Sequence, residues 1–160
     1  GSNLTDGFKC SLSVHDQSSL WSGDIDIILG VMSYILSYSE IKRLYDLDEK
    51  EQRYFISDYL KSKDPDSSTD NNEFLEVIKK RYKYSNDNFS NHSMGWSTDR
   101  GEIYIIYGPP ESIESLVSQP GNNITNRNNT FNIEKWYYSD KVFIFSNERT
   151  FGEMKLVNQF

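Results

Sequence analysis

The chain has 160 residues, a length typical of one domain that buries about 70% of its unfolded surface. Its aromatic content of 14% argues against general disorder, and its net charge of −7 argues against nucleic-acid binding and against adsorption to an anionic membrane. One cysteine and two histidines exclude an internal disulfide and, within one chain, cysteine-based or multi-histidine metal sites. We expect no metal and no cofactor.

The N-terminal end indicates a fragment of a longer protein. Gly1 and Ser2 are typical of residues left by tag cleavage, and we expect residues 1–20 to be a flexible segment at the edge of the domain. The lack of a signal peptide in such a fragment says nothing about the native compartment. No apolar stretch approaches the roughly 18 residues of a membrane span.

Start signals followed by apolar stripes predict helices in the first half of the chain. Residues 23–40 carry apolar side chains at helical spacing behind two aspartates. Three pairs have the spacing of capping boxes: Ser37 and Glu40, Asp48 and Glu51, and Asp70 and Glu73. In the helix that follows Asp70, we expect the basic run 79–81 to lie opposite the apolar stripe.

Residues 103–107, with the sequence IYIIY, fit two kinds of element. Their β-branched and aromatic side chains suit a strand that is buried on both faces, and β-propensity favours this interpretation. Thr98 as N-cap, acidic Asp99 and Glu102, and Gly108 before a proline pair suit a short helix instead. We expect a strand over residues 103–107, and a short helix remains the alternative.

The remainder of the chain predicts antiparallel strands. Residues 134–139 and 141–146 are β-branched and aromatic runs joined at Ser139 and Asp140, which indicates a tight hairpin. Residues 151–160 predict one more strand, and the polar segment 118–130 predicts an exposed loop.

These elements predict an α+β fold in which a helical N-terminal half packs on a small antiparallel β-sheet from the C-terminal half. We expect a single domain over residues 1–160. Between the two halves, Glu111 after Pro110 is expected to begin a further helix.

Candidate chemistry is sparse. Residues 64–70 match the oxygen-ligand spacing of a calcium loop, but Thr69 replaces its turn glycine and Leu75 its bidentate glutamate, so we expect a solvated turn. His92 lies in a polar connector with no nucleophile elbow around it, and we expect a surface histidine. Acid–base chemistry by carboxylates near residue 99 stays an alternative.

Residues 95–110, with the sequence GWSTDRGEIYIIYGPP, resemble the signature of the GWxTD domain family, and the resemblance runs from about residue 24 to 157. The residues that carry it, which are also our candidate site, are Gly95, Trp96, Thr98, Asp99, Arg100, Gly101, Tyr104, Tyr107, Gly108 and Pro109. Members of this family are typically C-terminal modules of exported proteins, often lipoproteins, of Bacteroidota and related bacteria. The resemblance therefore implies a periplasmic or outer-membrane-associated location. It transfers no catalytic residue, because the family has no agreed catalytic activity.

We interpret residues 95–110 as a structural joint rather than an active site, and call this segment the joint. Gly95 and Gly101 permit positive φ or close backbone approach, and Trp96 can fill the boundary between helices and sheet. Asp99 is expected to accept backbone N–H groups in a turn, and Arg100 offers a planar fork to a carboxylate or to carbonyls.

Two functions of different classes follow. We expect a non-catalytic interaction or scaffold module of a cell-envelope protein, whose partner is another envelope protein or another domain of the same chain. The alternative is a small-ligand-binding or hydrolytic enzyme domain with a site around Asp99 and Arg100. Such a site would be a concave pocket with converging polar groups, whereas side chains bonded only to backbone would weaken this alternative.

Overall fold

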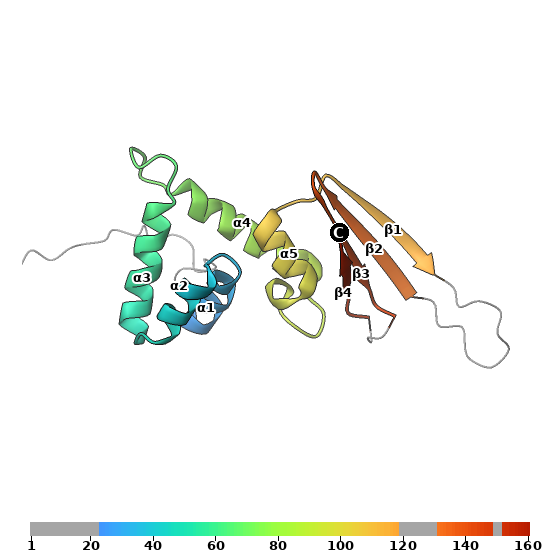
Figure 1. The fold of residues 1–160 in the computed structure, drawn as a ribbon, viewed down its shortest axis with the longest axis horizontal. Helices are drawn as coiled ribbons and strands as arrows, with labels where there is room; N and C mark the ends of the chain where they lie inside the picture. Colours follow the sequence, from blue (N-terminus) through green and yellow to red (C-terminus); the bar gives the residue numbers. More distant parts are fainter. Residues whose placement is uncertain (1–22, 119–130, 149–151) are drawn as a thin grey trace, which may run out of the picture.

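The computed structural model describes residues 23–118, 131–148 and 152–160, and within them a helical part precedes an antiparallel sheet (Figure 1). The helices are α1 (Ile25–Ser33), α2 (Tyr38–Tyr45), α3 (Glu49–Ser62), α4 (Glu73–Phe89), the short 3-10 helix η2 (Gly95–Ser97) and α5 (Asp99–Tyr107). The strands are β1 (Ser112–Ser118), β2 (Phe131–Tyr138), β3 (Lys141–Ser146) and β4 (Lys155–Gln159). The predicted α+β fold is confirmed. The segment 1–20 and, apart from Ser118, the predicted loop 118–130 lie outside the described residues.

The helix starts follow from side chains that accept the free backbone N–H groups of the first turn. The capping boxes of α2 and α3 are both formed, as predicted. The start predicted at Asp70 is wrong, because Asn72 is the N-cap of α4. The Asn72 amide accepts from the Leu75 N–H at 2.8 Å and donates to the Leu60 carbonyl at 2.7 Å. An aspartate could not make the second bond, since a carboxylate only accepts.

Residues 103–107 belong to helix α5, so the expected strand is wrong. Thr98 caps the helix, and Gly108, with φ of 80°, ends it. Ile105 packs among the helices, whereas Ile103 and Tyr104 pack against the sheet. A helix that is buried on two sides has no polar stripe, and its sequence therefore lacks the helical pattern of apolar spacing.

The sheet has the strand order β1-β2-β3-β4, and all three pairings are antiparallel. The hairpin at Ser139 and Asp140 and the fourth strand are both confirmed. The helix expected at Glu111 is wrong: the Glu111 N–H donates to the Tyr137 carbonyl at 2.8 Å, and strand β1 follows. Residues 112–117 of β1 are all exposed, so backbone pairing with β2 organises this segment rather than a buried apolar stripe.

Two hydrophobic clusters hold the fold together, and α4 and α5 contribute to both. The helix cluster consists of residues from α1 to α4 and Ile105 of α5. The sheet cluster consists of Phe89, Ile103, Tyr104, Trp136, Phe143, Phe145 and Met154. Helices α4 and α5 accordingly lie between α1–α3 on one side and the sheet on the other (Figure 1). None of the described helices is long and apolar enough to cross a membrane.

Candidate functional site

The two glycines of the joint allow the backbone to pack without intervening side chains. A Cβ atom at Gly95 would overlap the carbonyl oxygen of Ser85 on α4, and a Cβ atom at Gly101 would overlap the carbonyl oxygen of Gly95. The expected close backbone approach is therefore present at both positions. Positive φ occurs at neither; among the described glycines it occurs at Gly108 and Gly152.

Trp96 packs among the helices, so its expected place between helices and sheet is wrong. Its backbone N–H donates to Asn86 Oδ1 at 3.1 Å, which fixes η2 on α4. From there the indole reaches α1, where it lies against Gly30 and within 6.2 Å of the Tyr34 ring centroid. The Tyr82 ring of α4 flanks it at 6.4 Å. Gly30 provides the space for the indole, a role that its place in a helical pattern did not predict.

Thr98 is buried and satisfies both functions of its hydroxyl inside the joint. Its Oγ1 donates to the Gly95 carbonyl at 2.8 Å and accepts from the Gly101 N–H at 3.1 Å. The first bond closes the turn of η2, and the second caps α5. Within the described residues the Thr98 hydroxyl donates to a backbone carbonyl, whereas a nucleophile would require a base as its acceptor.

Asp99 connects the first turn of α5 to strand β4. Its Oδ2 accepts from the backbone N–H of Leu156 at 2.7 Å, and its Oδ1 lies 3.3 Å from Lys155 Nζ. The expected role as a backbone acceptor is present, but the donor lies in an edge strand 57 residues away rather than in a local turn. Because β4 is at the end of the sheet, its outward N–H needs such a partner.

Arg100 connects the same turn to the middle of the sheet, and it pairs with Glu134 rather than with Asp99. Its Nη1 lies 3.2 and 3.3 Å from the two carboxylate oxygens of Glu134, and its guanidinium carbon lies 5.0 Å from the centroid of the Phe89 ring. Glu134 Oε2 also accepts from Trp136 Nε1 at 3.2 Å. Sequence reasoning missed Glu134 as the partner of Arg100. The available signal was its place two residues before Trp136 on β2, because residues two apart share one face of a strand.

The C-terminal end of α5 is surrounded by aromatic rings. Tyr104 stacks on Tyr84 with ring centroids 4.3 Å apart, and burial raises the pKa of its phenol. Tyr107 contacts the ring of Tyr138, whose hydroxyl donates to the Gly108 carbonyl at 2.8 Å. Burial also raises the pKa of Tyr138, so this phenol stays protonated and acts as a donor at neutral pH.

Arg81 caps the end of α5, a role that sequence reasoning also missed. Its Nη1 donates to the carbonyls of Ile105 and Ile106 at 2.7 and 2.8 Å, and its burial lowers the pKa of the guanidinium. The expectation that the whole basic run 79–81 faces away from the apolar stripe is therefore wrong for this residue. Gly108 leaves room for the guanidinium, and the exposed Pro109 follows it. The only signal in the sequence was that a helix that ends at a glycine leaves its last carbonyls without intrahelical partners.

The other candidates provide no constellation of reactive groups. In the turn 64–70, Asp66 Oδ1 accepts from the Ser68 N–H and hydroxyl, which holds the pKa of this carboxyl below its usual value. His92 is exposed. Within the described parts of the chain, no group of three or more His, Cys, Asp or Glu side chains is placed to hold a metal ion.

A hollow of about 290 Å³ lies beside the Arg100–Glu134 pair. It is lined by Arg100, Ser115, Leu116, Val117, Asn132, Ile133, Glu134, Asn147, Gly152 and Met154. Asp99 does not line it. The two residues expected to share one site thus point to different parts of the sheet, and the charge of Arg100 is already compensated by Glu134.

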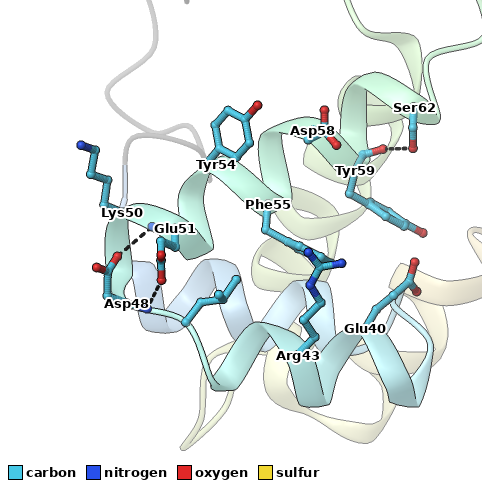
Figure 2. Close-up of a pocket in the computed structure, with 11 residues that line it drawn as sticks. Glu40, Arg43, Asp48, Lys50, Glu51, Tyr54, Phe55, Asp58, Tyr59 and Ser62 are labelled. Carbon is cyan, nitrogen blue, oxygen red and sulfur yellow. Dashed lines mark hydrogen bonds between the residues drawn. The ribbon is translucent and has the colours of Figure 1, made fainter.

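A larger hollow of about 720 Å³ lies between α2 and α3, far along the chain from the joint (Figure 2). Sequence reasoning missed it, because the spacing of Phe55 and Tyr59 fits the apolar stripe of a helix, whereas both side chains are only half-buried. The Arg43 guanidinium carbon lies 5.5 Å from the Phe55 ring centroid. The lining residues are Glu40, Arg43, Leu47, Asp48, Lys50, Glu51, Tyr54, Phe55, Asp58, Tyr59 and Ser62, and we call this hollow the α2–α3 groove.

Comparisons with known proteins agree with the resemblance in residues 95–110. Comparisons with curated proteins and with solved structures give no match. The family model of the GWxTD domain matches residues 8–155, which is almost the whole chain. The chain therefore belongs to the GWxTD domain family.

Proposed function

We propose that this chain is a non-catalytic interaction module of a cell-envelope protein. The observation that carries the proposal is that Thr98, Asp99 and Arg100, the three adjacent polar residues of the joint, each have a partner inside the fold. Thr98 bonds two backbone groups, Asp99 bonds the backbone of β4, and Arg100 pairs with Glu134. Side chains bonded in this way stabilise the domain, and a reaction that used them would first have to break these contacts.

The α2–α3 groove supports the interaction part of the proposal. Tyr54, Phe55 and Tyr59 line it together with Arg43, and these residue types are enriched where protein interfaces are buried. Phe55 points from α3 toward Arg43 on α2 (Figure 2), and Tyr54, which also lines the groove, is 75% exposed. The net charge of −7 favours a protein partner over a nucleic acid.

The partner in this proposal is another envelope protein or another domain of the same chain. The location, in the periplasm or at the outer membrane, is supported by the exported proteins in which GWxTD domains typically occur. This location, a lipoprotein context and an origin in Bacteroidota or related bacteria are all part of the proposal for this chain.

Replacing a groove residue tests the proposal. The immobilised chain is incubated with envelope extract from the source bacterium, and Tyr54→Ala is compared with Tyr38→Ala. Both side chains are highly exposed helix residues, at 75% and 84%, but Tyr38 does not line the groove. We expect the unmodified chain and Tyr38→Ala to retain the same protein and Tyr54→Ala to lose it. Equal retention by both variants, or no retained protein, would contradict the proposal.

The hollow beside Arg100 supports a second candidate function, binding of a small ligand. Asn132 and Asn147 supply amides next to a charged pair, a combination that could orient a polar molecule. A thermal-shift screen of sugars, short peptides and dicarboxylates tests it. We expect a true ligand to raise the Tm of the unmodified chain and not that of Asn132→Ala. A screen without any shift would remove this candidate.

A further inference from the structure

The outer edge of strand β1 is an open edge of the sheet. Strand β1 stands at the end of the strand order and pairs on one side with β2 (Figure 1). No other strand among the described residues pairs with its second side, and residues 112–117 are all exposed. At the opposite edge, Asp99 occupies the Leu156 N–H of β4, so the two edges differ.

Nothing in β1 protects this edge from pairing with another strand. Natural edge strands commonly carry a lysine, a proline or a bulge, which prevents pairing with the strand of another molecule. The sequence SIESLVS contains neither lysine nor proline, and its register with β2 is continuous over all seven residues. Its only charge, Glu114, lies 3.2 Å from Lys135 Nζ and accepts from the Tyr137 hydroxyl at 2.9 Å. The carboxylate is therefore already neutralised by β2 and does not repel a second strand of the same sequence.

The sequence of β1 is nearly symmetric about Ser115. If two copies pair antiparallel with Ser115 opposite Ser115, then Ile113 lies opposite Val117 and Ser112 lies opposite Ser118. Residues 113, 115 and 117 share one face of the strand, so this register keeps the helices of both copies on the same side of the sheet. Glu114 then lies opposite Leu116, and each carboxylate keeps its own Lys135.

We propose that two copies of this chain pair through the outer edge of β1, antiparallel and centred on Ser115, to form one continuous sheet. A second copy fits this edge because the strand matches itself at every position with an aliphatic, a serine or a neutralised side chain. The surface buried by one seven-residue strand pair is smaller than that of a stable interface. The dimer is therefore weak and depends on protein concentration.

A disulfide trap tests the register. In a Cys10→Ser background, which contains no other cysteine, Ser115→Cys places two thiols on the two-fold axis. The Cα atoms of directly opposite residues lie about 4.5–5.5 Å apart, within reach of a disulfide. The control is Ser112→Cys on the same strand, whose two copies would lie about 20 Å apart in this register. We expect a disulfide-linked dimer from Ser115→Cys and at least ten-fold less from Ser112→Cys. Equal or absent linkage of the two variants would overturn the proposal.

Sedimentation provides a test without cysteines. Val117→Lys places a charge on the β1 edge, and Val157→Lys places the same charge on β4, where the exposure of the original valine is similar, 68% against 59%. We expect the unmodified chain and Val157→Lys to associate as concentration rises, while Val117→Lys stays monomeric. A monomeric unmodified chain, or identical behaviour of the two variants, would overturn the proposal. Neither result bears on the α2–α3 groove, so this dimer and the proposed function can fail separately.

Discussion

Replacing Asp99 by alanine tests whether the joint is held at the point where α5 meets β4. The substitution removes the acceptor of the Leu156 N–H and the partner of Lys155 Nζ. A hydrogen bond to a charged group contributes about 1.5–3 kcal/mol, and the lower part of this range applies because the carboxylate is 31% exposed. The ion pair with Lys155 is partly exposed and adds at most about 1 kcal/mol.

These contributions predict that Asp99→Ala lowers the free energy of unfolding by about 2 kcal/mol. For a chain of this length the corresponding fall in Tm is about 4–8 °C. Asp99→Asn keeps one acceptor oxygen and should cost about half as much. Urea titration and thermal melts followed by circular dichroism at pH 7 measure both values.

Glu102, in the same turn of α5, supplies the matched control. Burial and the charge of Asp99 raise the pKa of Glu102, so the folded state disfavours its ionised form. At pH 7 we therefore expect Glu102→Gln to leave the Tm unchanged or to raise it. An Asp99→Ala protein as stable as the unmodified chain would refute our account of the joint. Arg100→Ala should show coupling in a double-mutant cycle with Glu134→Gln, its ion-pair partner, and none with Asp99→Ala.

Three further predictions concern the remainder of the joint. Gly101→Ala should cost about 3 kcal/mol or more in urea unfolding, because the added methyl overlaps the Gly95 carbonyl oxygen. Arg81→Ala should cost about 1–3 kcal/mol by the same assay, and Arg81→Lys should recover part of it, since one ammonium can still reach the carbonyls at the end of α5. The raised pKa of Tyr138 implies stability that is present below its unfolded pKa of 10.0 and is lost as pH rises above it, so Tyr138→Phe should show a shallower alkaline loss of Tm. It should also be less stable at pH 7 by about 1 kcal/mol, because the hydrogen bond to the Gly108 carbonyl is lost.

Features set by contacts between near neighbours were predictable from the sequence. The capping box of Ser37 and Glu40 spans three residues, and the hairpin at Ser139 and Asp140 joins adjacent strands. In both, the interacting groups are fixed by spacing along the chain. The family signature likewise gathered ten residues that the structure places around the two ends of α5.

Features set by distant contacts were not predictable. Arg81 reaches the end of α5 across 24 residues, and Arg100 reaches Glu134 across 34, and no spacing rule connects such pairs. Helix α5 was taken for a strand because packing on two sides replaced its polar face with isoleucine and tyrosine. Strand β1 was missed because a solvated strand is organised by the backbone of its neighbour rather than by its own side chains.

The membership of α5 in both hydrophobic clusters has a consequence for genetic experiments on this family. A substitution in α5 loosens the helix cluster and the sheet cluster together, so it lowers the folded fraction of the whole chain. In cells, a loss of about 1–2 kcal/mol can change protein abundance several-fold through proteolysis of unfolded molecules. A screen for loss of function would thus recover the signature residues whether or not they touch a partner. Only when the activity of each variant is divided by its steady-state protein level can a loss of partner binding be distinguished from a loss of folded protein.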